Sequence, residues 1–570
     1  MKKVVIYFFI VCGVSLTSCS DFMNITPQDS ITPNAVFSSL SSTRLFINDV
    51  YACLNGPLYD WTAIGKTYNK SMFDNAFTDD MVNNDNAWNQ FNFTASSAPF
   101  ERWTACYKAI RKANEGIENL KESEVLTQEE KERFLGDLYF LRGMFYFELF
   151  RFYGKLPIIE QVLNKEEDEI FLPRSSEEEV VEFILNDFQL AADYLPKDIT
   201  DTELGRATKG AAIGMKALVY LHAAGVLDAT YYEDAYKTAD ILINGELKGK
   251  YDLFRIGNSP EEIFHNLFLE EYEYNQEVIF DIQFAYPYKA SALQTLASPP
   301  KHGIDDYGWG NRDNPTQEIV DAFEMKDGTE FSWNNPVHAA NPYDNRDARF
   351  YASILYNGAF WKGDVLYTST NIWSDAEQRF VVNSPNGFAS ASNSTFTGYY
   401  LKKHMNESVI AGYSNRGLGV GGGHNLIVLR YAEILLVYAE AKNEVLPAPD
   451  QSVYDAVNTV RQRAGQPVLP SGLSQIEMRE RIRRERRIEL AFENKRYFDI
   501  VRWREGNKYL NQQCHGMKIS YSKVNGEIVP KYERVNLVKK VFDENKNYLL
   551  PVPQSAINKN PKLYPNNPGW

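Results

Sequence analysis

Apolar positions recur every three or four residues along much of this chain, which is the spacing of one face of an α-helix. The pattern predicts helices within residues 42–54, 100–120 and 127–154. The third segment carries nine aromatic residues between Phe134 and Tyr153, spread around the whole helix axis, so we expect burial on most sides. Thr127 followed by Glu130 fits a capping box at its start.

Two later pairs of segments share a second pattern, in which a helix rich in Ala and Gly precedes a helix bearing Ala and Tyr. The first pair is 209–224 with 231–244, and the second is 429–444 with 452–465. Each pair resembles the tetratricopeptide helix hairpin, where small residues let two helices approach closely. The two pairs start 220 residues apart rather than about 34, so the array is interrupted.

The interruption, residues 250–424, is rich in Asn, Gly, Pro, Asp, Trp and Tyr and has few helical periods. Irregular insertions in helical repeats tend to gather on one face, often the binding face. We therefore expect helical parts at 37–249 and 425–570, packed together as one domain, with the loop-rich insertion at 250–424 carrying much of the binding face.

The first 18 residues have the layout of a signal peptide, with Lys2 and Lys3 ahead of an apolar run that ends at Leu16. That run is too short to span a bilayer comfortably, and no later run is long enough. Leu16-Thr17-Ser18-Cys19 resembles a bacterial lipobox, which implies a lipidated Cys19 and a tether over 19–36. Ser20 fits export to the outer membrane by resemblance to sorting rules. The alternative is a plain signal peptide cleaved near Cys19.

The composition narrows the class of partner. With 44% hydrophobic and 14% aromatic residues the chain is globular, and its formal charge of −15 disfavours nucleic acid and anionic lipid. Cys53, Cys106 and Cys514 are widely spaced and form neither a CxxC metal motif nor a disulfide framework.

Motifs for catalysis are scarce in this sequence. It contains no GxSxG, HExxH or GxxxxGK[ST], and we expect neither a cofactor nor a metal. The run 417–422 fits GxGxxG, but we interpret it as a flexible loop that leads into a helix over 425–436. The acid pairs Asp79-Asp80 and Asp305-Asp306 invite comparison with glycosidases, which need two carboxylates about 5–9 Å apart across a sugar. We interpret them instead as solvated loop acids, with a bond to a sugar hydroxyl as the second option.

The basic stretch 478–503 has acids among its arginines, which argues against nucleic acid binding. On one continuous helix a single stripe would hold both apolar and charged side chains: Met478, Ile482, Glu485, Glu489, Phe492 and Arg496. We interpret this stripe as a partly buried ion network that fixes helix packing.

Several segments together resemble the SusD/RagB family of outer-membrane glycan-binding lipoproteins of Bacteroidetes. They are CSDFMNITPQDSIT, LGDLYFLRGMFYFELFRFYGKLPII, GRATKGAAIGMKALVYLHAA, LRYAEILLVYAEAKNE, RRERRIELAFENKRYFDIVRW and YLLPVPQSAINKNPKLYPNNPGW. The resemblance implies a mostly α-helical protein with four tetratricopeptide-like hairpins in a right-handed superhelical scaffold. It also implies a protein without enzymatic activity that captures oligosaccharide at the cell surface and covers a SusC-like TonB-dependent transporter.

The resemblance also suggests a binding platform of aromatic side chains, because a pyranose offers an apolar face to a ring. The positions that match are Trp88, Trp309 and Tyr286, and the alternative for each is an aromatic packed inward. Candidate partners for sugar hydroxyls are Asp80, Asn83, Tyr307 and Asn311.

Two other functions stay open beside surface glycan capture. The chain could be a scaffold that binds protein or peptide, or takes up a non-sugar nutrient, through the same exposed aromatics. A glycoside hydrolase is the third hypothesis. The preferred glycan does not transfer from the family, so starch, xylan, xyloglucan, levan, pectin and host glycans all remain candidates.

Overall fold

A computed structural model gives the fold of this chain. It describes residues 36–55, 74–83, 90–91, 93–97, 102–164, 166, 169–285, 289, 291, 293–301, 308–310, 312–409, 413–414, 417–418 and 422–570.

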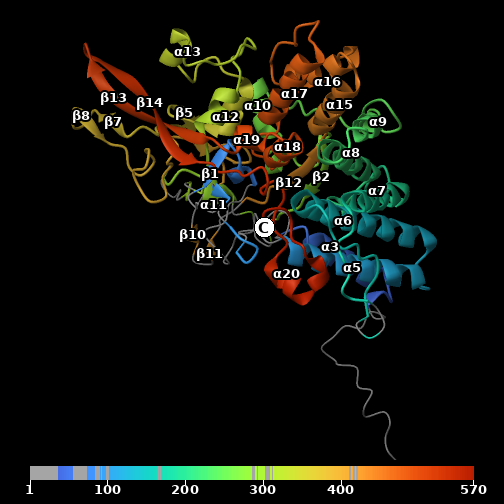
Figure 1. Cartoon of the computed structure of the whole chain (residues 1–570). Coiled ribbons are helices and arrows are strands. Elements are labelled where there is room, and N and C mark those ends of the chain that lie inside the picture. The colour runs from blue at the N-terminus through green and yellow to red at the C-terminus, as the bar shows by residue number, and fades with distance from the viewer. Residues whose placement is uncertain are drawn as a thin grey trace, which may run out of the picture.

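The N-terminal helices pack in chain order, each against the next, along one side of the molecule (Figure 1). They are α3 (Leu40–Ala52), α5 (Trp103–Glu122), α6 (Gln128–Tyr153), α7 (Glu177–Tyr194), α8 (Lys209–Val226) and α9 (Tyr231–Ile243). The helices predicted at 42–54, 100–120, 127–154, 209–224 and 231–244 are therefore confirmed.

Helix α6 is the buried centre of this stack. From Phe134 onward nearly every side chain of α6 is buried, including all nine aromatics, because α5 and α7 pack against it. The capping box is also present: the Glu130 N–H donates to Thr127 Oγ1 (3.3 Å), and the Thr127 N–H donates to Glu130 Oε2 (2.9 Å). A helix that is apolar on all sides is stable only inside a larger core.

The C-terminal helices close back onto the first group. Helix α15 (Tyr431–Val445) packs against α9, α16 (Gln451–Arg463) and α17 (Gln475–Glu489), while α18 (Arg496–Arg502) packs against α8. Helices dominate, and the described strands form only two-stranded sheets, so the predicted mostly-α class is confirmed.

The helix expected over 425–436 begins later than predicted. Residues Leu426–Arg430 form strand β12, which pairs antiparallel with β2 (Val278–Ile282), and the helix starts at Tyr431. The prediction failed because a short, fully buried apolar run fits a strand as well as a helix. In the glycine-rich run 417–422, Gly417 and Leu418 form a short strand, and residues 419–421 lie outside the described residues.

Short elements fill the insertion. Its helices are α10 (Pro260–Asn266), α11 (Leu293–Ala297), α12 (Gln317–Ala322), α13 (Pro336–Ala340) and α14 (Ala348–Ser353). Its strands after β2 are β3 (Asp313–Pro315), β4 (Ile354–Leu355), β5 (Ala359–Trp361), β6 (Asp364–Leu366), β7 (Asn371–Ser374), β8 (Arg379–Val382), β9 (Tyr400–Leu401), β10 (Tyr413–Ser414) and β11 (Gly417–Leu418).

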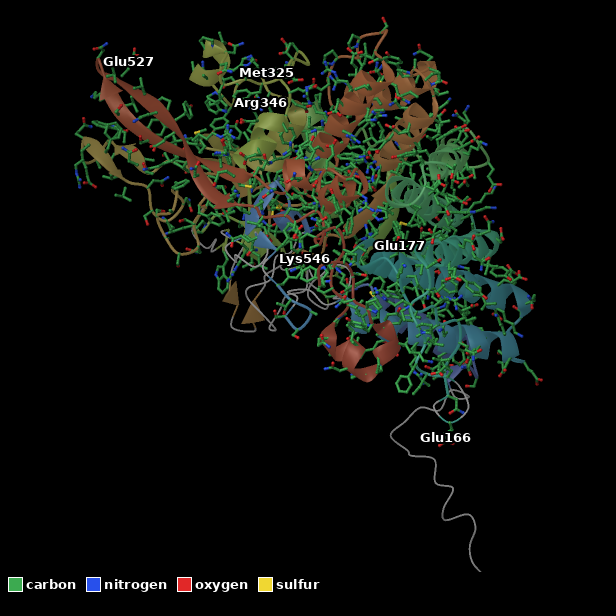
Figure 2. The ribbon with its side chains drawn as sticks, in the orientation of Figure 1. Glu166, Glu177, Met325, Arg346, Glu527 and Lys546 are labelled. Atoms are coloured by element: carbon green, nitrogen blue, oxygen red, sulfur yellow. The ribbon has the colours of Figure 1, made fainter. Side chains whose placement is uncertain are left out.

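A long hairpin of β13 (Gln513–Val524) and β14 (Glu527–Lys539) projects from the body, with Glu527 at its tip (Figures 1 and 2). Tyr521 of β13 stands opposite Pro530 of β14. The Tyr521 N–H donates to Asn371 Oδ1 (2.7 Å), and Asn371 Nδ2 donates to the Tyr521 carbonyl (2.9 Å). Within the described part of the chain, β14 has β13 as its single strand neighbour.

The predicted ion network exists and is fully buried. Glu489 accepts from Arg349 Nη1 (2.9 Å) and Arg430 Nη1 (2.6 Å), and it also pairs with Arg463. Arg430 extends the network to Glu277 (2.8 Å). Because these arginines come from the insertion, β12 and α16, the network joins the insertion to the helical scaffold.

The single helix expected over 478–503 is wrong, because α17 ends at Glu489 and α18 begins at Arg496. Phe492 and Asn494 between them have φ values of 63° and 60°, a left-handed conformation that ends a right-handed helix. The turn brings Glu493 to Arg430 (2.7 Å) and Lys403 (2.6 Å), so the break adds a carboxylate to the network.

Among the described helices, none combines the length and apolar character that a bilayer crossing needs.

Candidate functional site

A short antiparallel ladder joins two segments of the predicted binding face. Strand β1 (Met81–Asn83) pairs with β3, and Asn83 stands opposite Asp313 at one end, where Asn83 Nδ2 donates to Asp313 Oδ1 (3.0 Å). In an antiparallel pair, the chain that follows one strand and the chain that precedes the other leave from the same end. The two stretches that leave here lead to Trp88 and from Trp309.

The acids ahead of β1 hold this ladder to the helical scaffold. Asp79 pairs with Arg496 (3.1 Å), and Asp80 pairs with Arg487 (2.7 Å). Both carboxylates are buried, so their interpretation as solvated loop acids is wrong. Burial raises the pKa of Asp80, whereas at Asp79 the charges of Arg487 and Arg496 outweigh burial and lower the pKa. Asp80 and Asn83 are thus engaged inside the protein, so we do not retain them as partners of a sugar.

Lys540, at the end of the long hairpin, holds the same segment from the other side. Its ammonium group is fully buried and donates to the carbonyls of Ala76 (2.5 Å) and Met81 (3.1 Å). Burial lowers the pKa of Lys540 to about 8. No sequence pattern marked this lysine, because its partners lie more than 450 positions away in the chain.

Trp309 lies half-buried on the surface of the core, directly ahead of β3. Its backbone N–H donates to the Thr295 carbonyl on α11 (2.7 Å), and the guanidinium of Arg312 lies 6.0 Å from the ring centroid. The glycines on either side, Gly308 and Gly310, are required, because a Cβ at either position would clash with the Ser298 carbonyl. The tryptophan is therefore mounted on a tightly packed backbone.

A second loop supports the Trp309 segment. Asn393 Nδ2 donates to the Gly308 carbonyl (2.9 Å), and the Tyr400 hydroxyl donates to the Asn386 carbonyl (2.9 Å). Asn386 Oδ1 in turn accepts from the Lys301 N–H (2.9 Å). These bonds tie residues 301, 308 and 386–400 into one frame next to Trp309 in the chain.

The other predicted site residues lie outside the described part of the chain: Trp88, Tyr286, Tyr307, Asn311, the acid pair Asp305-Asp306 and the lipidation residue Cys19. They remain predictions.

Among the residues that the structure describes, no group of three or more His, Cys, Asp or Glu side chains is placed to hold a metal ion. The arrangement holds one aromatic side chain, that of Trp309, on a fixed backbone among loops. The chain thus belongs to the class of helical-hairpin scaffolds that present side chains on loops.

Comparison with known proteins gives the family. The SusD family model matches residues 276–570, and a second model, described as starch-binding associating with outer membrane, matches residues 26–221. The chain belongs to the SusD family.

Relatives of known sequence and structure agree with this assignment. SusD-like protein P2 of Formosa agariphila is 27% identical and aligns over 100% of both chains. A SusD-like protein of Bacteroides fragilis, 29% identical, has a TM-score of 0.76 over 96% of this chain and 100% of its own. A SusD-like carbohydrate binding protein of the same species is 27% identical, with a TM-score of 0.74 over 93% of this chain and 99% of its own.

Proposed function

We propose that this chain is a non-catalytic, cell-surface glycan-binding lipoprotein that captures oligosaccharide or polysaccharide and delivers it to a SusC-like TonB-dependent transporter. The observation that carries the proposal is the half-exposed Trp309 ring on a backbone fixed by α11, the 386–400 loop and the β1–β3 ladder. A fixed ring at the surface suits stacking against the apolar face of a sugar. The description of the second family model and the carbohydrate-binding relative support the same ligand class.

Within this proposal, Trp88 and Tyr286 complete the platform, with Tyr307 and Asn311 as partners for hydroxyl groups. The ladder supports this arrangement, because the stretch toward Trp88 leaves it beside the stretch from Trp309. Lys289 and Ala285, which stand on either side of Tyr286 in the chain, exchange backbone hydrogen bonds (2.8 and 2.6 Å).

Trp309→Ala is expected to weaken binding of the preferred glycan at least about fivefold, because each sugar–ring stack contributes on the order of 1 kcal/mol. The measurement is native affinity electrophoresis against gels that contain plant, fungal, bacterial and host polysaccharides. Trp373→Ala is the matched control, since Trp373 is also half-exposed but lies on the β7 hairpin. Equal retardation of the parent and Trp309→Ala would remove this ring from the site, and release of reducing ends would indicate a hydrolase.

We further propose that Cys19 carries the lipid that anchors the protein to the outer membrane, facing the cell exterior. Cys19→Ala is expected to move the protein from the membrane fraction to the soluble fraction, because stable attachment requires several acyl chains. Fractionation followed by immunoblotting measures this, and Cys12→Ala in the same N-terminal segment is the control. Full membrane retention of a cleaved Cys19→Ala protein would identify the transporter, rather than lipid, as the main tether.

A further inference from the structure

A cavity of about 300 Å³ lies between α3 and the end of β2, and the proposed function does not use it. Arg44, Asn48 and Tyr51 line it from α3, where spacings of four and three residues place them on one face of the helix. Asp281, Gln283 and Lys289 line the opposite side. Its volume is at the lower end of the range for small-ligand sites, about 300–1,000 Å³.

Two cationic side chains in this cavity lack the carboxylate partner that most buried or half-buried cations of the described chain have. Arg44 and Lys289 are both half-buried, yet in the part of the chain that the structure describes neither has a carboxylate within ion-pairing distance. Burial lowers the pKa of Lys289, and no acidic neighbour opposes this shift. The Lys289 ammonium lies 5.5 Å from the Phe284 ring centroid. An aromatic ring attracts a cation but does not neutralise its charge.

Of the other charged residues that line the cavity, Arg206 and Glu203 have ion-pair partners, whereas Asp281 bonds to a neutral amide. Arg206 donates to Asp137 (2.7 Å) and to Asn48 Oδ1 (2.6 Å), and Glu203 lies 3.6 Å from Arg133. Asp281 is only 5% exposed and accepts from Asn425 Nδ2 (2.9 Å). The two unpaired cations outnumber this one carboxylate, which is almost covered, and in a chain with 15 more acidic than basic residues such an excess of positive charge favours an anion.

Neutral hydrogen-bonding groups lie beside these two cations. Asn48 Oδ1 is occupied by Arg206, which leaves its amide N–H groups to donate, and Gln283 uses its own amide to donate to the Tyr274 hydroxyl (2.7 Å). The Gln283 carbonyl can therefore accept from a hydroxyl group. A site with cations, an amide donor and an amide acceptor matches a sugar that carries an anionic substituent.

We propose that this cavity, with Arg44 and Lys289 as its anion-binding groups, is a subsite for an acidic sugar residue of the captured glycan. The inference rests on the proposed function, because Lys289 follows Tyr286 by three positions in the chain, and its backbone exchanges hydrogen bonds with that of Ala285. The anionic group is a uronate carboxylate or a sulfate ester. Asn48 and Gln283 bind the hydroxyl groups of the same ring.

The test uses matched pairs of glycans and the full chain purified in detergent. One pair is polygalacturonate and its fully methyl-esterified form, and the other is a sulfated galactan and the same galactan after desulfation. Affinity electrophoresis and calorimetric titration measure binding to each. We expect the parent protein to bind the charged member of one pair about tenfold more tightly than its neutral partner, and the pair that responds identifies the anion.

The variants Arg44→Gln and Lys289→Gln are each expected to remove most of this tenfold preference. Arg44→Lys keeps a cation at this position and should retain a measurable part of the preference for the charged glycan. Arg255→Gln and Lys248→Gln are the controls, because both side chains are exposed and line none of the cavities near the site. A thermal unfolding curve that matches the parent establishes that each variant is folded.

Three other outcomes would overturn either the acidic subsite or the proposed function. Equal binding of the charged and neutral members, with loss of both in Trp309→Ala, would overturn the acidic subsite and leave the proposed function intact. A charge preference that persists in the Arg44→Gln, Lys289→Gln double variant would place the anion elsewhere and also overturn the inference. Failure to bind any glycan, charged or neutral, would overturn the proposed function itself.

Discussion

Glu489→Gln is expected to lower the free energy of unfolding by about 3–5 kcal/mol, the usual cost of breaking a buried ion pair from one side. Glu489 is fully buried and pairs with Arg349, Arg430 and Arg463. These charges outweigh the effect of burial and hold the pKa of Glu489 well below its usual range. The amide would leave three guanidinium groups around a neutral side chain in a medium where an uncompensated charge is costly.

Urea denaturation followed by circular dichroism measures this loss. Glu480→Gln is the matched control, because Glu480 lies on the same helix but its side chain is 54% exposed and pairs at the surface with Arg483 (3.5 Å). Exposed pairs contribute at most about 1 kcal/mol, so the control should lie close to the parent. Similar unfolding curves for the two variants would show that the network contributes little to stability.

The second large effect is expected on acidification. Burial would raise the pKa of Glu493, but Arg430 and Lys403 outweigh it and lower the pKa to about 2. Arg486 and Arg502 likewise hold the pKa of Asp499 at about 2. The unfolded chain takes up these protons near pH 4 to 5 while the folded chain does not, so the contribution of these two carboxylates to stability is constant above about pH 5 and falls as pH drops toward 2.

For Glu493 alone, the lowered pKa contributes about 3 kcal/mol to the free energy of unfolding at pH 7. Urea unfolding at pH 7, 5, 4 and 3 tests it, with Glu493→Gln as the comparison, since that variant should lose less stability over the same range. Burial lowers the pKa of Lys403 to about 8, so this lysine stays charged throughout the acid window and does not change the sign. An unfolding free energy that is constant down to pH 3 would contradict the prediction.

The long helices could be predicted from the sequence because their causes are local. Helix α6 has an apolar period, a capping box and a length that no alternative structure explains. The break between α17 and α18 could not be predicted, because the helical spacing continues through Phe492 and Arg496 in the sequence. The positive φ angles there are selected by ion pairs with Arg430 and Lys403, which are distant in the chain.

The site shows the same division between local and distant causes. Trp309 could be proposed because the family resemblance fixes its place in the chain. The burial of Asp80 could not, since its partner Arg487 is 407 residues away and two adjacent acids before a short strand look solvated in sequence. Arg44 and Lys289 carry no motif, and their significance comes only from the cavity that the fold builds between α3 and β2.

The position of Pro530 in the projecting hairpin has a consequence for how copies of this chain meet one another. Because the peptide groups of Tyr521 face Asn371, the opposing Pro530 is at a non-hydrogen-bonded position of the ladder, and its ring nitrogen points to the outer edge of β14. Proline has no N–H, so this edge lacks a donor at the fourth residue of β14, close to the hairpin tip. Another extended chain cannot pair continuously along it. A long strand can therefore project from the protein without recruiting neighbouring copies into a shared sheet.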